Sequence, residues 1–408
     1  MRAEAPSEKA RTAPLEQAVR LAAAGEPLSL ASFIESALLF SGIVEASLEG
    51  EKAEVYALIS QTAAVIDRSQ EARRLAEEIL QFMHEQVLTI YREEQTRLDV
   101  LLKKGSFNCV SSAILYAILA KSMGLKVWGI RAKDHAFCRV QAGDQAFDVE
   151  TTSPFGFDPG SRKEFTDHFG LVTGYTYVSP TNYRDRLDTG ERGLLSLILY
   201  NRQAFLSERR EYVQAVGPAV DAYAMLKDEE SYERLIVSLS NLGSWYGIRR
   251  RYQEAMEFLG KALEDYNEPR LSKLRQDLFH NWVIELINKG RLDEALSLMD
   301  ARFENGEVEE EEWKKLTVYA YQVKAQGLAR EDFEQAALLI REALDKIGRD
   351  PGLLRSYEVY NHNQVVRLLN SSLYEDARRV LDSALTVLPD SVLLRKDQRL
   401  IDSRLETQ

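Results

Sequence analysis

The sequence predicts an α+β domain that follows a helical lead-in and precedes an array of helix pairs. Three observations carry this prediction. Apolar residues recur at helical spacing from about Leu15 to Leu102. Short runs rich in β-branched and aromatic residues follow between Lys126 and Glu150. Beyond Asp188, small residues return at regular intervals. The 408 residues allow two to three domains, which we place at 15–180 (lead-in and α+β domain) and 190–408 (helical array).

The composition is that of a globular protein. Hydrophobic residues make up 45% of the chain and charged residues 28%, which argues against disorder. The net charge of -12 would repel phosphate backbones and anionic lipid heads, so we expect no nucleic-acid partner. Two cysteines cannot form a disulfide framework, and the sequence shows neither a signal peptide nor an integral membrane segment. A cytoplasmic location is the default expectation, with the compartment left open.

The N-terminal region is expected to be helical after a short disordered end. Residues 1–14 mix charge with Ala and Pro and show no apolar period, which is typical of a frayed terminus. From Leu15 onward, the only breaks that we expect are at Gly25-Glu26-Pro27 and around Gly50. This pattern predicts an all-helical lead-in.

The hydrophobic pattern of the sequence changes at Asn108. An apolar helix is predicted from Asn108, a good N-cap, to Gly124, which favours a C-terminal stop. This helix is apolar on nearly all sides, so we expect it to be buried. Three strands are predicted to follow, at Lys126–Arg131, His135–Val140 and Ala146–Glu150.

The C-terminal half contains an internal repeat. Five segments of similar sequence each carry an alanine, at Ala215, Ala255, Ala295, Ala336 and Ala377, with separations of 40, 40, 41 and 41 residues. Seven residues later come Ala222, Ala262, Arg302, Ala343 and Ala384 on the same helical face. Pairs of small residues let neighbouring helices approach closely, so the pattern predicts stacked helix pairs.

Two of these units resemble the tetratricopeptide repeat. The relevant positions are Leu242, Gly243, Tyr246, Ala255, Leu259, Ala262 and Pro269 in one unit, and Ala377, Leu381, Ala384 and Pro389 in the last. The period exceeds the family's usual length of about 34 residues, which indicates longer helices or loops. The resemblance implies a curved α-α solenoid of about five helix pairs that binds a protein or peptide. Alternatively, the array only packs against the α+β domain.

Cys109 is the candidate nucleophile. It is the first residue of the predicted buried helix, where unpaired backbone N–H groups and the helix dipole favour an anion, and thus a thiolate. The alternative is that Cys109 is a small buried residue with no chemical role, as free cysteines commonly are.

His135 is the candidate base that accepts the thiol proton. A carboxylate is then needed to orient the imidazole, and the following hairpin offers Glu150 and Asp148. A two-residue loop at Ala142-Gly143 places Glu150 directly opposite His135, whereas a loop at Gly143-Asp144 places it one diagonal step away. Asp148 is farther in both registers, so we prefer Glu150 and keep Asp148 in reserve.

Cys138 is a poor rival nucleophile. It lies three residues after His135 in the predicted strand, so it should project to the opposite face, into the core. A zinc site built from Cys109, His135 and Cys138 would need ligands from both faces of the strand, contrary to the geometry that zinc requires.

These motifs resemble the transglutaminase-like superfamily of papain-type folds, specifically its bacterial members that carry tetratricopeptide repeats. The resemblance rests on Asn-Cys-Val-Ser-Ser from Asn108, Asp-His-Ala-Phe-Cys-Arg-Val around His135 and Phe-Asp-Val-Glu-Thr-Thr around Glu150. It covers about Tyr91 to Gly160. It implies a Cys-His-Asp triad in which Cys109 is the nucleophile and His135 the base. Glu150 aligns with the family's usual aspartate.

A developing oxyanion needs hydrogen-bond donors beside the thiol. The backbone N–H of Cys109 is the first candidate. Gln95, just upstream in the sequence, or the Asn108 side chain is the candidate for the second donor. The alternative for Gln95 is a solvated residue on a helix surface.

We expect no cofactor and no metal site. The sequence has no glycine-rich phosphate cradle, dinucleotide fingerprint or calcium loop. The remaining histidines occur singly and without ligand spacing, which is typical of surface or satisfied core residues; they are His84, His168, His280 and His362.

The sequence therefore favours a cysteine-dependent hydrolase or acyltransferase that acts on an amide, peptide-like bond, with the repeats docking a partner or substrate. The alternative is a catalytically inactive transglutaminase-like domain within a tetratricopeptide adaptor or scaffold protein, in which Cys109 only contributes packing.

Overall fold

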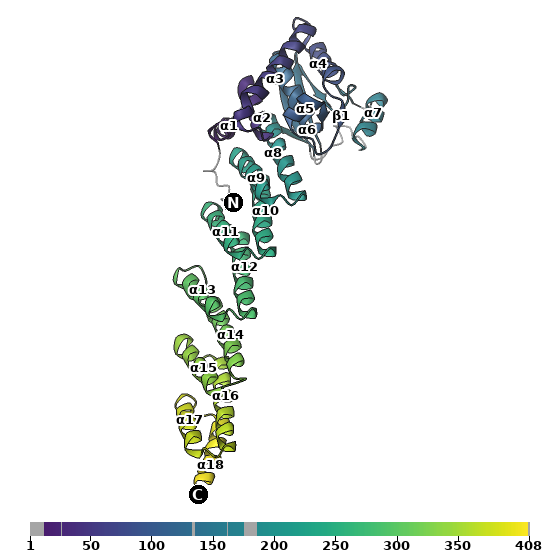
Figure 1. The fold of residues 1–408 in the computed structure, drawn as a ribbon. Coiled ribbons are helices and arrows are strands. Elements are labelled where there is room, and N and C mark those ends of the chain that lie inside the picture. Colours follow the sequence, from purple (N-terminus) through teal and green to yellow (C-terminus); the bar gives the residue numbers. More distant parts are fainter. Residues whose placement is uncertain (1–11, 26, 133–134, 161, 175–185, 407–408) are drawn as a thin grey trace. The chain divides into compact units, whose positions relative to one another are not determined.

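The computed structural model describes residues 12–25, 27–132, 135–160, 162–174 and 186–406. A mixed α+β region comes first and a long run of packed helix pairs follows, which confirms the predicted order (Figure 1). The described residues divide into two compact units. One contains the chain up to Ile248 together with Glu257–Leu271, and the other contains Arg249–Met256 together with the chain from Ser272 on.

The first unit begins with helices and a small sheet region. Its elements before the helical run are α1 (Ala13–Ala23), α2 (Leu30–Phe40), α3 (Glu45–Val65), α4 (Ala72–Gln86), β1 (Ile90–Tyr91), α5 (Leu98–Lys104), β2 (Ser106–Phe107), α6 (Cys109–Ser122), β3 (Lys126–Arg131), β4 (Ala136–Ala142), β5 (Gln145–Val149), α7 (Lys163–Thr173) and β6 (Leu187–Thr189). Residues 1–14 were predicted to be frayed: residues 1–11 lie outside the described residues, and the prediction is wrong for Ala13 and Pro14, which begin α1. Within the described ranges, no helix has the length and hydropathy needed to cross a membrane.

The lead-in differs from the predicted helical pattern in several places. Helices α2 and α3 end at Phe40 and Val65, where no break was expected. Gly50 does not interrupt a helix, because α3 continues through it. The chain between α4 and α5 is not helical: β1 pairs in parallel with β2, with Ile90 opposite Ser106. Gly105, at φ 63°, ends α5 and turns the chain into β2. Strand pairing formed in the tertiary structure overrides the local helical pattern here.

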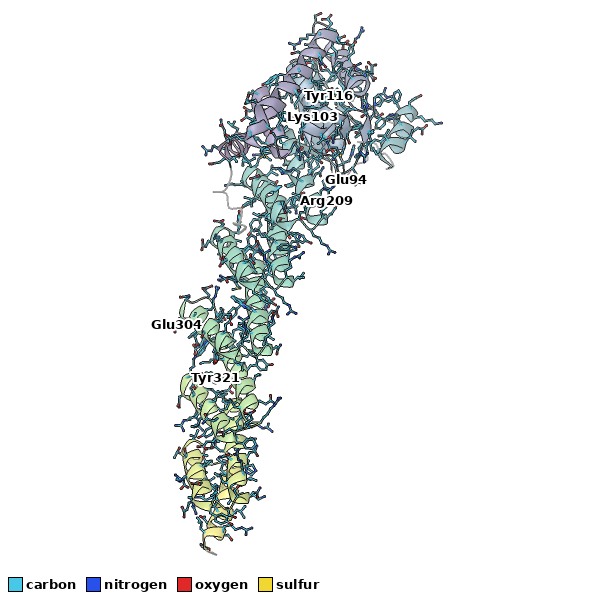
Figure 2. The ribbon with its side chains drawn as sticks, in the orientation of Figure 1. Glu94, Lys103, Tyr116, Arg209, Glu304 and Tyr321 are labelled. Atoms are coloured by element: carbon cyan, nitrogen blue, oxygen red, sulfur yellow. The ribbon has the colours of Figure 1, made fainter. Side chains whose placement is uncertain are left out.

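Helix α6 lies at the centre of the first unit's core. Every residue from Val110 to Ala120 is buried, and the helix contacts β3 and β4 as well as α2, α4, α5 and α8. Tyr116 is fully buried, and its hydroxyl donates to the Ala76 carbonyl of α4 at 3.0 Å (Figure 2). The predicted burial of this helix on all sides is confirmed.

The larger sheet has the strand order β5-β4-β3-β6, and all of its pairs are antiparallel. Ala142 pairs with Gln145, so the hairpin loop is Gly143-Asp144, the second of the two predicted registers. Strand β4 begins one residue after His135, and β5 ends one residue before Glu150. The two side chains therefore flank the ends of neighbouring strands.

The helical run starts immediately after β6. Its helices are α8 (Gly190–Glu208), α9 (Tyr212–Leu226), α10 (Glu229–Ile248), α11 (Tyr252–Tyr266), α12 (Pro269–Asn288), α13 (Leu292–Glu304), α14 (Glu310–Leu328), α15 (Phe333–Ile347), α16 (Pro351–Asn370), α17 (Tyr374–Val387) and α18 (Val392–Leu405). In the first unit α8 packs on α9 and α9 on α10, and in the second unit each helix from α13 to α18 packs on the next.

The alanines that mark the repeat are buried in α9, α11, α13, α15 and α17. All five are 0% exposed: Ala215, Ala255, Ala295, Ala336 and Ala377. The four alanines that lie seven residues later in their helices are also buried; they are Ala222, Ala262, Ala343 and Ala384. Arg302 of α13 occupies the fifth such position, and its guanidinium pairs with Glu307. The spacing of small residues thus predicted correctly which helix faces are packed.

Candidate active site

Cys109 opens α6 at a capped helix N-terminus. The Asn108 side chain accepts hydrogen bonds from the backbone N–H groups of Val110 (3.0 Å) and Ser111 (2.9 Å), and the Ser111 hydroxyl accepts from the Asn108 backbone N–H in return. Cys109 is half-buried. As the first residue of α6, it presents a backbone N–H that has no acceptor within the helix. An anion at the sulfur is favoured at this position by the helix dipole.

His135 lies beside Cys109 and contacts Glu150. Its Nε2 hydrogen-bonds Glu150 Oε2. Burial lowers the pKa of His135, but the negative charge of Glu150 and hydrogen bonds with Cys109 and Glu150 raise it more, so that the pKa is about 10. The ring therefore holds a proton at neutral pH. Since Nε2 is engaged by Glu150, Nδ1 is the nitrogen available to the Cys109 sulfur.

Glu150 is only 2% exposed and is held by the loop that follows β5. Its Oε1 accepts from the Thr152 backbone N–H (3.2 Å) and hydroxyl (2.8 Å), so both carboxylate oxygens are hydrogen-bonded. The Glu150 backbone N–H donates to the Gly156 carbonyl at 2.8 Å. A Cβ on Gly156 would lie 1.8 Å from the Glu150 carbonyl oxygen, so only glycine fits this close approach.

Asp148, the reserve candidate for the acid, lies in a different environment. Its carboxylate is paired with Arg186 at 2.7 and 2.8 Å and with Arg139 at 3.2 Å. It has no hydrogen bond with His135 among those formed by the described residues. The structure therefore brings Glu150, and not Asp148, to the imidazole.

The two side-chain candidates for the second oxyanion donor are both engaged elsewhere. Gln95 Nε2 donates to the carbonyls of Arg97 (2.7 Å) and Ser106 (3.3 Å). Asn108 Nδ2 donates to the Glu93 carbonyl (2.8 Å) and to another acceptor on the same loop, the Thr96 hydroxyl (2.9 Å). Because an amide has only two N–H groups, neither side chain has one left for an oxyanion. The backbone N–H of Cys109 remains the candidate oxyanion donor, because it has no acceptor within α6.

Cys138 is buried in the sheet. It is 0% exposed, and its thiol donates to the Ala113 carbonyl of α6 at 3.2 Å. Burial, followed by the charge of Glu150, raises the pKa of the Cys138 thiol. The predicted core position is confirmed, and this thiol has no access to the cleft described next.

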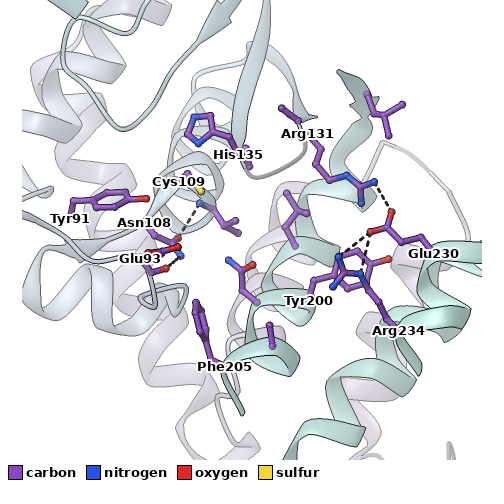
Figure 3. A pocket seen from close by; sticks show the side chains of 17 residues that line it. Tyr91, Glu93, Asn108, Cys109, Arg131, His135, Tyr200, Phe205, Glu230 and Arg234 are labelled. Carbon is purple, nitrogen blue, oxygen red and sulfur yellow. Dashed lines mark hydrogen bonds and ion pairs between the residues drawn. The ribbon is translucent and has the colours of Figure 1, made fainter. Parts of the chain in front are cut away.

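A cleft of about 650 Å³ opens beside Cys109 and His135 (Figure 3). One wall comes from the α+β elements and the other from helices α8 and α10. Its lining residues are Tyr91, Glu93, Asn108, Cys109, Val110, Arg131, Ala132, His135, Ala136, Leu187, Leu197, Tyr200, Asn201, Ala204, Phe205, Glu230 and Arg234. The sulfur therefore faces a space large enough for a substrate segment.

Sequence reasoning missed the wall formed by α8 and α10. Tyr200, Glu230 and Arg234 lie in the helical run, far along the chain from Cys109, and no local motif distinguishes them from ordinary helix residues. Tyr200 reaches the cleft because α8 packs on β3 and α6, and Glu230 and Arg234 reach it because α10 packs on α9, which packs on α8.

The remaining histidines do not join the site. His84 is hydrogen-bonded to the Thr151 carbonyl at 3.1 Å, and burial lowers its pKa to about 4. His280 pairs with Glu312 and His362 with Asp397, each at 2.7 Å. His168 departs from the prediction of a surface or satisfied core residue, because its Nδ1 is buried without a hydrogen-bond partner among the described residues. Across the described ranges, no three His, Cys, Asp or Glu side chains are grouped to hold a metal ion.

Comparisons with known proteins add no family. No protein-family model matches the chain, and no curated protein is significantly similar to it in sequence. The class that the fold and the cleft define is therefore an α+β domain with a cysteine–histidine–carboxylate cluster at a helix N-terminus, joined to a run of helix pairs.

Proposed function

We propose that the protein is a cysteine-dependent hydrolase or acyltransferase that acts on an amide, peptide-like bond, and that it is related to the transglutaminase-like superfamily. One observation carries the proposal. Cys109 stands at the N-terminus of a buried helix, beside an imidazole that is bonded to a buried carboxylate, and faces a cleft. This is the arrangement by which a thiol is activated for nucleophilic attack.

The resting state follows from the charges. His135, with a pKa of about 10, carries a proton at neutral pH, and Glu150 stabilises the resulting cation. When that proton comes from Cys109, the pair is a thiolate and an imidazolium. Glu150 also fixes the ring so that Nδ1 points toward the sulfur, because Nε2 is already engaged.

The reaction then proceeds in two steps. The thiolate attacks the amide carbonyl, and His135 donates its proton to the departing amine as the C–N bond breaks, leaving a thioester on Cys109. Water or a second amine attacks the thioester carbonyl and gives a proton to His135. The C–S bond breaks, and the proton on His135 restores the starting ion pair. The backbone N–H of Cys109 stabilises the oxyanion in both steps.

The helical run contributes to the same site. Helices α8 and α10 supply one wall of the cleft, which supports a role for the tetratricopeptide-like repeats in holding the substrate. The rest of the run, with its stacked helix pairs, is suited to binding a protein or peptide partner.

Acylation by an activated ester tests the proposal. With p-nitrophenyl acetate, the wild-type protein should release a burst of one equivalent of nitrophenolate and gain one acetyl group on Cys109, detected by intact-mass spectrometry and peptide mapping. Cys109→Ala should lose both signals. Cys138→Ala, which removes the protein's other thiol, should keep them.

Two results would overturn the assignment. Equal acetylation of wild type and Cys109→Ala would place the reactive group elsewhere. A Cys109 thiol that reacts no faster than free cysteine at pH 6 would instead support the adaptor alternative, in which the cleft is catalytically silent.

A further inference from the structure

A charged cluster occupies the wall of the cleft opposite Cys109. Arg131 ends β3, and Glu230 and Arg234 lie in the first two turns of α10. Arg131 donates to Glu230 Oε2 at 2.6 Å, while Nε and a terminal nitrogen of Arg234 both lie 3.2 Å from Glu230 Oε1. Figure 3 shows this cluster across the cleft from the Cys109–His135 pair. A single carboxylate thus stands between two guanidinium groups.

The cluster has more hydrogen-bond donors than Glu230 uses. Each guanidinium has five N–H groups, and Glu230 engages one nitrogen of Arg131 and two of Arg234. The three side chains stay partly exposed: that of Arg131 by 25%, that of Glu230 by 39% and that of Arg234 by 40%. A ligand in the cleft can therefore reach the remaining donors.

Tyr200 provides a second, independent observation. This residue is 5% exposed, and its hydroxyl is buried with no hydrogen-bond partner among the described residues. The Arg234 guanidinium stacks over its ring at 4.3 Å. Burial raises the pKa of Tyr200, so the phenol stays neutral and keeps its proton to donate. A buried donor without an acceptor is costly, so an acceptor group that reaches this hydroxyl would stabilise the wall.

From these observations we infer that the Arg131–Arg234–Tyr200 wall binds a carboxylate of the substrate, so that the preferred substrate is an acidic peptide-like amide. Planar guanidinium groups match the geometry of a carboxylate and bind it by paired, charge-assisted hydrogen bonds. Glu230 holds both guanidinium groups in place. The selection of an anion is notable in a chain whose net charge is -12, because the overall field would repel one. The inference rests on the proposed function, since it assigns the specificity of that same cleft.

Four matched electrophiles test the inference. The probes are chloroacetyl-Gly-Asp amide, its neutral counterpart chloroacetyl-Gly-Asn amide, the free acid chloroacetyl-Gly-Asn, and chloroacetyl-Gly-Lys amide. In each case the Cys109 thiolate forms a C–S bond as the C–Cl bond breaks and chloride leaves. The second-order rate constant for alkylation of Cys109 is measured by mass spectrometry. The aspartyl amide and the free acid separate a side-chain carboxylate from a terminal one.

We expect at least one carboxylate probe to react about tenfold faster than the neutral amide. The lysyl probe should react more slowly than the neutral amide. Arg131→Gln and Arg234→Gln should each reduce this preference, measured as the ratio of the carboxylate-probe rate to the neutral-probe rate, about threefold or more. Arg234→Glu should shift the preference toward the lysyl probe. Arg209→Gln is the matched control. This arginine is exposed at the end of α8 and does not line the cleft, so the preference should stay unchanged (Figure 2).

The outcomes separate the inference from the proposed function. If the neutral probe reacts rapidly but the carboxylate probes gain nothing, the inference is wrong and the proposed function stands. If the preference for a carboxylate survives both arginine substitutions, its origin is the His135 cation and the inference is also wrong. If even the neutral probe reacts no faster with Cys109 than with free cysteine, the proposed function itself fails. Thermal unfolding of each variant confirms that the fold is retained.

Discussion

The two cysteines lie against the same helix in opposite surroundings. Cys109 stands at the N-terminus of α6, half-buried, next to a protonated imidazole and a cleft. Cys138 lies in β4 against the middle of α6, fully buried, with its thiol donating to the Ala113 carbonyl. At the first position the Cys109 backbone N–H has no acceptor within the helix, whereas at the second position the helix offers a carbonyl to the thiol.

We expect this difference in surroundings to set the reactivity of the two thiols. A helix N-terminus and a cation both stabilise a thiolate. A carbonyl acceptor and an apolar core stabilise the neutral thiol, which agrees with the raised pKa of Cys138. The same buried helix therefore carries the proposed nucleophile at its end and a packing residue along its side.

The largest expected effect comes from removing the carboxylate that supports the His135 cation. In Glu150→Gln, the pKa of His135 should fall, because the charge of Glu150 raises it. The imidazole would then lose its proton near neutral pH, and Cys109 would approach the behaviour of a free thiol, which ionises only near pH 8.5. We expect alkylation of Cys109 by iodoacetamide to slow by about 100-fold at pH 6 and much less at pH 9. A full pH–rate profile measures this.

Asp148→Asn is the matched control for that substitution. It changes a neighbouring carboxylate that is bonded to Arg186 and Arg139, not to His135. The pH–rate profile of Cys109 alkylation should therefore stay within about twofold of wild type, although the loss of the ion pairs lowers stability. If the two variants slow alkylation equally, the comparison between the two carboxylates is wrong.

These two carboxylates also show how far the sequence predicted the site. Residue type and period-two alternation selected Glu150 and Asp148 together, because both share a strand face with His135. The choice between them depends on the sharp turn at Gly156, which directs Glu150 toward the imidazole, and on Arg186, which engages Asp148. Strand alternation did not separate the two, but the hairpin register, which places Asp148 farther from His135, favoured Glu150, and the structure agrees.

The fold was predictable where one periodic signal dominated. The regular alanines marked the packed faces of the helical run, and the apolar sequence around Tyr116 marked α6 as buried. The lead-in was less predictable near Gly105, where a short parallel strand pair replaces a helix. The wall of the cleft at Tyr200 could not be predicted, because it depends on how α8 packs against the sheet.

A smaller effect should distinguish the two cysteines in stability. Cys138→Ala removes a fully buried sulfur and leaves the Ala113 carbonyl without its thiol donor, so we expect a loss of about 1 to 2 kcal/mol in the free energy of unfolding. Cys109→Ala, at a half-buried position on the cleft, should cost less than about 1 kcal/mol. Urea unfolding monitored by circular dichroism measures both. The reverse order would contradict the assignment of Cys138 to packing and of Cys109 to chemistry.

The smallest expected effect concerns Gln95, which the sequence indicated as a candidate for the second oxyanion donor. Its amide N–H groups bind the carbonyls of Arg97 and Ser106, and it does not line the cleft within the part of the chain that the structure describes. Gln95→Ala should therefore change the nitrophenolate burst rate by less than about threefold, whereas loss of a true oxyanion donor costs about 100-fold or more. A loss of that larger size would show that Gln95 turns toward the Cys109 sulfur when an acyl group is bound. The oxyanion would then be held by a side chain as well as by the end of α6.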